Sequence, residues 1–306
     1  MKKLIEYIKN PKSILIGLDR KRIINLNDSF YLKYVYKEQT GKKLNLKNPQ
    51  TFNEKLQWLK IHDRKDIYTT MVDKYEAKKY VASIIGDEYI IPTLGVYDSF
   101  DDIDFSKLPN KFVIKCTHDS GGLVICRDKK KLNILEAKQK IEKCLKKNYY
   151  YAWREWPYKN VKPRIIIEKY MEDAESNDLK DYKLFCFDGK PEFLYVSEGL
   201  ENHDTAKMIF LDMNYKPTKF KRRDFNNFDT LPKKPINFEL MKKFAAILSK
   251  NIKHVRIDFY EINSKLYFGE MTFYTSGGFI PFEPAEYDKL LGDLIDLKER
   301  KERKWK

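Results

Sequence analysis

Two short polar turns, each lying between apolar stretches, limit most strongly what this chain can fold into. One is Asp188-Gly189 and the other is Asn263-Ser264. Residues of the Asn, Asp and Gly type accept the left-handed backbone of a two-residue hairpin turn, so the flanking strands should pair antiparallel. These four strands are expected at 182–187, 192–197, 257–262 and 266–271.

A third hairpin is expected where two apolar runs flank the polar loop 117–122. For the helices, Thr51 is a suitable N-cap with Glu54 at the capping-box position. The further strands are predicted at 111–116, 123–126, 164–171, 208–211 and 255–260, and the helices at 51–59, 71–85, 132–151 and 286–303. Strands in hairpins with helices set between them predict an α+β fold with a mostly antiparallel sheet.

The composition argues against several classes of protein. The 21 Tyr and 19 Phe are too many aromatic residues for a disordered chain. The formal net charge is +15, yet only 11 of the 60 basic residues are Arg, the residue that favours paired contacts with phosphates and guanines. Charge carried by Lys along the whole chain is more typical of a solvated surface, so we expect no nucleic acid as a partner.

The cysteines and the apolar runs favour a cytoplasmic protein. The four cysteines, at 116, 126, 144 and 186, form no CxxC pair, and no His lies near enough for a zinc knuckle. Structural thiols of this kind are typical of a reducing compartment. No apolar run is long enough for a signal peptide or a membrane span.

Lys115 ends one predicted strand and is followed by a loop of small residues, Asp119 to Gly122. Glycines let backbone N–H groups approach a phosphate closely, and the lysine would add a positive charge. The loop is not a Walker A motif, because no Gly-Lys-Ser/Thr follows. Taken alone, it fits an ordinary hairpin loop with an exposed lysine better than a phosphate site.

Asp258 and Glu270 lie on consecutive predicted strands, at similar distances from the turn that joins them. Antiparallel pairing should bring them roughly opposite each other. Two carboxylates on one sheet face repel unless a cation lies between them, and such hard oxygen ligands suit Mg²⁺ that bridges phosphates. The alternative is an exposed acidic pair that Arg256 and Lys265 balance.

The segment Glu168-Lys169-Tyr170-Met171 ends an apolar strand. Backbone groups that leave a strand there can bond the edge of an adenine ring. Glu175, seven residues after Glu168, could bind ribose hydroxyls. A strand end with solvated charges is the more common explanation of this pattern.

The order of these motifs resembles that of the ATP-grasp superfamily, and most closely its TupA-like branch, typified by the teichuronopeptide-biosynthesis protein. The resemblance covers residues 50–295, and the combined set is more specific than any one motif. The stretches that carry it are Thr51 to Trp58, Asp73-Lys74, Phe112 to Gly122, Glu168 to Met171, Asp181 to Pro191, Arg256 to Tyr260 and Gly269 to Tyr274.

This resemblance implies an ATP-grasp fold, in which two α+β subdomains clasp ATP, with a helical segment before them. The helical segment would be 1–66, the first subdomain with its phosphate-lid hairpin 67–167, and the second subdomain with the metal site 168–306. ATP and Mg²⁺ would be the cofactors. The cofactor-binding residues would be Lys74, Lys115, Ser120, Gly121 and Gly122 at the phosphates, Glu168, Lys169 and Met171 at the adenine, and Glu175 at the ribose.

The resemblance also implies catalytic and metal-binding residues. Lys183 would reach the phosphates from the following strand, and Arg256 would lie beside the transferring phosphoryl group. Asp258, Glu270 and Thr272 would hold Mg²⁺. Many ATP-grasp enzymes have Asn where this chain has Thr272, and a hydroxyl is a weaker metal ligand than that amide.

A carboxylate–amine ligase that works through an acyl phosphate and releases ADP and phosphate is the implied activity. The carboxylate would belong to a uronic acid of a surface or capsular polysaccharide, or of its precursor, and the partner would be an amino acid or another amine. His118 could serve as a base, although a structural contact in the loop is favoured. Ser276-Gly277-Gly278 could bind a substrate carboxylate or could equally be a plain turn.

Two rival functions remain at this level. A nucleotide-sugar glycosyltransferase would use Asp102-Ile103-Asp104 as a DxD motif, although such motifs are frequent by chance. A binding protein without catalytic activity would use the basic tail 298–306 to touch an anionic membrane, so membrane contact is expected to be peripheral at most. The sequence gives no expectation for the oligomeric state.

Overall fold

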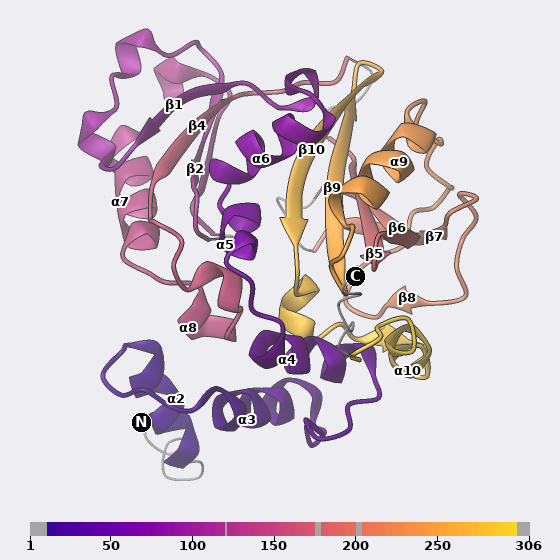
Figure 1. Ribbon diagram of the computed structural model, residues 1–306. Helices are drawn as coiled ribbons and strands as arrows, with labels where there is room; N and C mark the ends of the chain where they lie inside the picture. Colours follow the sequence, from indigo (N-terminus) through magenta and orange to yellow (C-terminus); the bar gives the residue numbers. More distant parts are fainter. Residues whose placement is uncertain (1–10, 120, 175–178, 200–203, 299–306) are drawn as a thin grey trace, which may run out of the picture.

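The computed structural model describes residues 11–119, 121–174, 179–199 and 204–298, which form two main antiparallel sheets surrounded by helices (Figure 1). The predicted α+β class with mostly antiparallel sheets is confirmed. The first sheet has the strand order β1-β4-β2-β3. Its strands are β1 (Thr93–Tyr97), β4 (Ile165–Lys169), β2 (Phe112–Cys116) and β3 (Leu123–Cys126). Helix α7 (Ile134–Leu145) packs on this sheet and shares a core with it.

The second sheet has five strands in the order β10-β9-β5-β6-β7. Its strands are β10 (Lys265–Thr272), β9 (Val255–Ile262), β5 (Asp181–Phe187), β6 (Lys190–Glu198) and β7 (Lys207–Asp212). Both predicted two-residue turns are confirmed, because Asp188 and Gly189 have φ values of 51° and 84°, and Asn263 and Ser264 have 50° and 62°. Helix α9 (Phe238–Leu248) packs on β5, β6 and β9.

Three N-terminal helices lie along the bottom of the molecule in Figure 1: α2 (Pro11–Arg20), α3 (Asp28–Thr40) and α4 (Phe52–His62). The predicted capping box is confirmed, with 3.2 Å from Glu54 N to Thr51 Oγ1 and 3.2 Å from Thr51 N to a Glu54 carboxylate oxygen. The amide of Asn53 bonds both the N–H and the carbonyl of Ile280. Helix α4 therefore holds the chain segment that follows β10.

The helix predicted at 71–85 is wrong in one respect, because the structure has two helices there, α5 (Ile67–Val72) and α6 (Glu76–Ile85). Asp73 Oδ1 accepts hydrogen bonds from Tyr75 N at 2.9 Å and Glu76 N at 3.3 Å, which satisfies two backbone N–H groups at the start of α6. The N–H of Lys74 bonds the carbonyl of Thr117 at 3.0 Å. The break thus fastens the start of α6 to the loop after β2.

The helix predicted at 132–151 is also interrupted: α7 ends at Leu145 and α8 (Tyr150–Trp153) starts where Asn148 Oδ1 accepts from Tyr150 N. The helix predicted at 286–303 is short in the described part, where α10 spans Tyr287–Gly292. The remaining elements are η1 (Asp87–Tyr89), η2 (Phe100–Asp102), η3 (Phe105–Lys107), η4 (Lys129–Lys131), η5 (Trp156–Tyr158), η6 (Thr275–Gly278), β8 (Lys221–Arg222) and β11 (Phe282–Glu283).

Helices α5 and α6 lie between the two main sheets and contact β10 (Figure 1). Just after α6, Ile90 forms an isolated parallel bridge with Phe268 of β10. The segment that leads into the first sheet is therefore joined to the edge of the second. The subdomain boundary predicted between residues 167 and 168 falls inside β4.

Candidate active site

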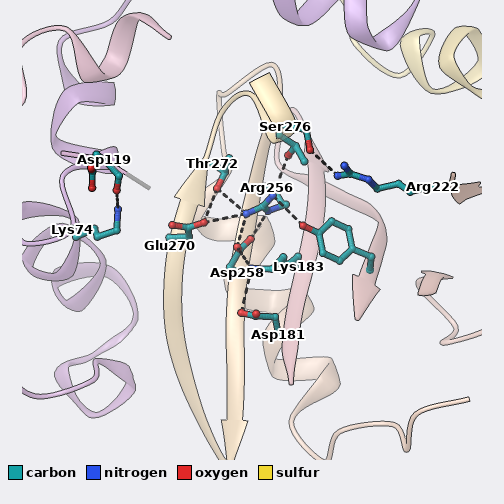
Figure 2. A network of polar contacts seen from close by, with 12 residues as sticks. Lys74, Asp119, Asp181, Lys183, Arg222, Arg256, Asp258, Glu270, Thr272 and Ser276 are labelled. Carbon is teal, nitrogen blue, oxygen red and sulfur yellow. Dashed lines mark hydrogen bonds and ion pairs between the residues drawn. The ribbon is translucent and has the colours of Figure 1, made fainter. Parts of the chain in front are cut away.

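Asp258 is at the centre of a buried polar network on the second sheet (Figure 2). Strand pairing places Lys183 of β5 directly across from it, with Lys183 Nζ 2.7 Å from Asp258 Oδ2. Arg256, two residues earlier on β9, donates from Nε to Oδ1 and from Nη2 to Oδ2, both at 2.6 Å. The Asp258 side chain is 1% exposed. The sheet thus holds a fully buried carboxylate between two cations.

A β-bulge in β10 brings Glu270 to the same network. The register of β10 on β9 shifts between Phe268 and Met271, so that Gly269 and Glu270 together lie opposite Asp258, as the sequence predicts. Glu270 Oε1 accepts from Arg256 Nη2 at 3.1 Å and from Thr272 Oγ1 at 3.2 Å. Its side chain is 43% exposed. Glu270 is therefore the carboxylate of the pair that a ligand can reach.

The surrounding cations keep Glu270 ionised. Partial burial by itself raises the pKa of this carboxyl, but Lys183, Lys74 and Arg256 outweigh this effect and lower the pKa to about 2. At neutral pH the site therefore presents a permanent negative charge beside three positive ones. The negative charge attracts a metal cation and the positive charges attract an anion, so the site suits a ligand made of both.

Lys74 lies across from Glu270, on the side of the site that the first sheet and its loops form (Figure 2). Its ammonium donates to the carbonyl of Asp119, so the lysine is tied to the loop between β2 and β3. The same loop closes on itself, because Asp119 Oδ1 accepts from Gly122 N at 3.0 Å and Gly122 O accepts from Cys116 N at 2.7 Å. A Cβ at Gly122 would lie 2.5 Å from Cys116 Sγ, so this position has no room for a side chain.

A cavity of about 700 Å³ adjoins the network. Its walls come from both halves of the protein: Lys115 of β2 and Lys169 of β4 from the first sheet, and Asp181 and Tyr260 from the second. The residues predicted to bind cofactor that line it are Lys115, Glu168, Lys169 and Met171. The structure thus gathers these predicted residues around one space of a size that suits a small organic ligand.

The Glu168 carboxylate is held between two lysines. Lys115 Nζ is 2.6 Å from Glu168 Oε2, and Lys78 of α6 pairs with Oε1. Burial raises the pKa of Glu168, but Lys115 and Lys78 outweigh it and lower the pKa to about 2. This carboxylate therefore fixes the position of Lys115 as well as lining the cavity.

Other predicted positions stand apart from this network. Ser120 and Glu175 lie outside the described residues, whereas Gly121 and Gly122 lie in the loop that Lys74 contacts. His118 is 2% exposed, and its Nε2 is 3.2 Å from the carbonyls of Cys144 and Lys147, so the structure favours the structural contact over a base.

The turn Ser276-Gly277-Gly278 is held by α4. Its carbonyls at Gly277 and Gly278 accept hydrogen bonds from Gln57, and the Gly277 carbonyl also accepts from Lys60 at 2.7 Å. Ser276 Oγ is 2.6 Å from Arg222 Nη1 (Figure 2). The backbone has positive φ at all three residues, which a tight turn of this kind requires.

Sequence reasoning missed two charged residues of the site, Lys78 and Asp181. Lys78 comes four residues after Lys74 in the sequence, and a lysine pair at that spacing beside a predicted helix was a usable signal. Asp181 precedes Lys183 by two residues on one strand, which puts both on the same face. Asp181 Oδ1 is 3.2 Å from Lys183 Nζ, and the residue lines the cavity.

The predicted metal ligands fit Mg²⁺ in chemistry. In the described ranges no cluster of three or more His, Cys, Asp or Glu side chains could hold a metal ion. Asp258, Glu270 and Thr272 offer oxygen atoms alone, and Mg²⁺ commonly takes one or two carboxylates and completes its shell with water and phosphate oxygens. Both oxygens of Asp258 accept from Arg256, so a metal ion there would replace those contacts, whereas Glu270 is open.

One residue of the DxD sequence behind the glycosyltransferase alternative has local partners. Asp104 Oδ1 accepts from Ser106 N at 3.0 Å and its carboxylate pairs with Lys107, so this end of the DxD sequence caps a turn. The tail residues 299–306 lie outside the described part. No helix that the structure describes is both long and apolar enough to cross a membrane.

Comparison with solved structures gives distant similarity to ligases. D-alanine–D-alanine ligase from Bacillus anthracis, complexed with ATP, is 17% identical over 74% of this chain and 63% of its own, with a TM-score of 0.41. The Helicobacter pylori D-alanine–D-alanine ligase is 16% identical over 72% and 61%, with a TM-score of 0.43. The ATP-grasp ligase PsnB, complexed with a phosphomimetic variant of its minimal precursor, Mg and ADP, is 7% identical over 68% and 50%, with a TM-score of 0.35. The chain spans less than two thirds of the length of each of these ligases.

Comparison with protein families gives a match over most of the sequence. No curated protein matches this chain. The family model described as TupA-like ATPgrasp matches residues 54–296, which include every site residue discussed above. The chain belongs to the TupA-like ATP-grasp family.

Proposed function

We propose that this protein is an ATP-dependent ligase that joins a carboxylate to an amine through an acyl phosphate. ATP-grasp enzymes use ATP and Mg²⁺. The observation that carries the proposal is the buried network of Lys183, Arg256 and Asp258, with the open Glu270 beside it and a 700 Å³ cavity adjoining it.

In this proposal the cavity takes the nucleotide. Lys115, held by Glu168, reaches its phosphates from the first sheet, and Lys74 does so from the turn before α6. The backbone that leaves β4 at Lys169 to Met171 bonds the adenine. A bound Mg²⁺ at Glu270, Thr272 and Asp258 would neutralise phosphate charge.

The chain's own residues mainly position the reacting groups and neutralise the negative charge of the phosphates. In-line phosphoryl transfer requires both. A carboxylate oxygen of the substrate attacks the γ-phosphorus of ATP, and ADP leaves. The amine nitrogen then attacks the acyl carbon, and phosphate leaves as the C–N bond forms. Arg256 and Lys183 offset the charge that develops on the transferring group, because the sheet has already fixed both cations.

The carboxylate substrate in this proposal is a uronic acid of a surface or capsular polysaccharide, or of its precursor, and the amine is an amino acid or a similar compound. Two things support this choice: the resemblance to the teichuronopeptide branch, and the net charge of +15, which favours an acidic substrate. The proposal also expects the reaction to occur in the cytoplasm, where ATP is available.

Thermal unfolding with and without ATP and Mg²⁺ tests the proposal. A ligand at about 100 times its dissociation constant should stabilise the fold by about 2.7 kcal/mol. We expect a Mg²⁺-dependent shift in the wild type and in Glu192→Gln, a control on the same sheet, and a much smaller shift in Glu270→Gln. A shift with a UDP-sugar and none with ATP would favour the glycosyltransferase, and release of AMP in place of ADP would contradict the acyl-phosphate route.

A further inference from the structure

Ser276 projects from the turn that follows β10. It is exposed, whereas the other residues of 273–278 are buried. Its φ of 52° and ψ of 34° lie in the left-handed region, which is unfavourable for a residue with a Cβ atom. Backbone conformations of this kind persist only where the surrounding structure holds them, and they are frequent at functional sites. The turn therefore presents one hydroxyl group to solvent at a cost in backbone energy.

Helix α4 holds the turn in this conformation. Gln57 and Lys60 donate three hydrogen bonds to the carbonyls of Gly277 and Gly278. A Cβ at Gly278 would lie 2.4 Å from Gln57 Nε2, so the backbone is in close contact with the helix. These bonds involve backbone carbonyls and leave the hydroxyl of Ser276 on the other side of the turn.

Arg222 of β8 is fixed with one end of its guanidinium group against this hydroxyl. Its Nε and Nη2 donate to the two oxygens of Asp224 at 2.9 and 2.6 Å, and its guanidinium carbon lies 4.9 Å from the centre of the Phe225 ring. Its Nη1 donates to Ser276 Oγ at 2.6 Å (Figure 2). A guanidinium group has five N–H groups, and these bonds use three of them. Arg222 is thus an oriented cation with N–H groups left for a ligand.

The pair of Arg222 and Ser276 adjoins the proposed reaction centre. Thr275, the residue before Ser276, has its Oγ1 3.5 Å from Arg256 Nη1. The Cα atoms of consecutive residues lie about 3.8 Å apart, so the two arginines contact neighbouring points of one short turn. In Figure 2 Ser276 lies between Arg222 and Arg256. A ligand with two acidic groups can therefore place one at Arg222 while the other is at the reaction centre.

Further cations flank Arg222 in the sequence. Lys219, Lys221 and Arg223 are exposed, whereas the side chain of Arg222 is 9% exposed, so the extended segment alternates between solvent and protein. Lys221 pairs with Glu283 at 3.2 Å, and no carboxylate in the described part of the chain pairs with Lys219 or Arg223. These cations face away from Ser276. They attract anions towards this surface over a Debye length of about 8 Å and do not contact a ligand at Arg222.

We propose that Arg222 and Ser276 bind an acidic group of the acceptor that neighbours the activated carboxylate, so that the acceptor is a chain of uronic acids and not a single sugar. The inference rests on the proposed function, whose substrate class it narrows. A guanidinium group binds a carboxylate through charge-assisted hydrogen bonds. The oxygen of Ser276 accepts from Arg222, so its own hydrogen is free to donate to the same carboxylate. No bond is made or broken at this subsite, which positions the chain.

The test compares the wild type with Arg222→Gln, Ser276→Gly and a control, Lys190→Gln. Ser276→Gly removes the hydroxyl group but keeps the left-handed backbone, which glycine adopts without strain. Lys190→Gln removes a cation of β6 that is 74% exposed. The probes are galacturonate and trigalacturonate. Binding of trigalacturonate is measured by calorimetry without ATP. Activation of both probes is measured with ATP, Mg²⁺ and hydroxylamine, whose nitrogen displaces phosphate from the acyl phosphate to give a hydroxamate.

We expect the wild type to have a KM for trigalacturonate at least about 10-fold below that for galacturonate, because a second charged contact is made. Arg222→Gln should raise the Kd and KM for trigalacturonate by about 10- to 100-fold and leave kcat and the KM for galacturonate within about threefold. Ser276→Gly should raise the same two constants by about 3- to 10-fold, the effect of one neutral hydrogen bond. Lys190→Gln should behave as the wild type.

Several outcomes would overturn the inference. They are equal KM values of the wild type for the two probes, an equal effect of Arg222→Gln on both probes, and an effect of Lys190→Gln as large as that of Arg222→Gln. If Arg222→Gln does not fold, Ser276→Gly decides, and an unchanged Kd for trigalacturonate then refutes the subsite. Tighter binding of UDP-glucuronate than of trigalacturonate, lost in Arg222→Gln, would assign the subsite to a diphosphate and refute the glycan chain.

The two readouts separate this inference from the proposed function. Trigalacturonate binding that Arg222→Gln weakens, without hydroxamate from either probe, supports the subsite and counts against the proposed ligase. Hydroxamate from galacturonate, without trigalacturonate binding, supports the ligase and overturns the subsite.

Discussion

Replacement of Glu168 by Gln tests whether the two lysines of the first sheet depend on this one carboxylate. The pKa of Glu168 is about 2, against an ordinary value of 4.5. A difference of this size corresponds to about 3 kcal/mol of stability at neutral pH, within the range for breaking a buried ion pair. The side chain is 7% exposed, so solvent screening does not reduce the figure much. We expect Glu168→Gln to lower the free energy of unfolding by about 3 kcal/mol at pH 7, measured by urea denaturation.

The pH dependence supplies a second check on the same variant. Because the folded pKa is lowered, the stabilisation is present above the unfolded value of about 4.5 and is lost as the pH falls towards about 2. The two unfolding curves should therefore converge in acid. Glu172→Gln is the matched control, because Glu172 pairs with Lys111 at the surface and is 52% exposed, so its loss should cost less than about 1 kcal/mol. A loss below 1 kcal/mol for Glu168→Gln at pH 7, or a difference that persists in acid, would refute the reasoning.

Two further predictions concern the lid loop and Lys60. Gly122→Ala should destabilise the protein by about 1–3 kcal/mol in urea denaturation, because the new Cβ would lie 2.5 Å from Cys116 Sγ. In the control Gly121→Ala, the nearest neighbour of the new Cβ lies at 3.9 Å, so this variant should be about as stable as the wild type. Equal effects of the two substitutions would contradict the packing argument. Burial lowers the pKa of Lys60 to about 7 from 10.5, so the folded protein binds fewer protons than the unfolded chain between these values, and stability should rise with pH across that window. Lys60→Met should show a smaller rise than the wild type when urea midpoints are measured from pH 7 to 10, and an unchanged slope would contradict the assignment.

The hairpins and the opposed carboxylates could be predicted because both depend on local rules. A two-residue turn fixes the register of its strands, and the register then decides which side chains lie opposite each other. The bulge at Gly269 and Glu270 left this prediction valid. It inserts one residue opposite Asp258, so Glu270 still lies across from Asp258. The resemblance to ATP-grasp proteins used the same motifs in order, which is why it agrees with the family match.

The contacts that could not be predicted are those between segments far apart in the sequence. One example is the pairing of the Glu168 carboxylate with Lys78 and Lys115, which come from α6 and β2. The break before α6 was missed for a related reason: Asp73 bonds the backbone at the start of the new helix and pairs with Arg164, 91 residues further along the chain.

Asp258 and Glu270 look equivalent in the sequence, yet the structure gives them different surroundings. Asp258 is 1% exposed and bonded by Arg256 and Lys183, so its charge fixes two cations before any ligand arrives. Glu270 is 43% exposed and shares one oxygen with Arg256 and Thr272. Electrostatic catalysis is most effective when charges are already oriented, because no reorganisation is then needed during the reaction. One carboxylate therefore orients the cations while the other remains open, and the site can bind a phosphate–metal ligand without first rearranging its buried charges.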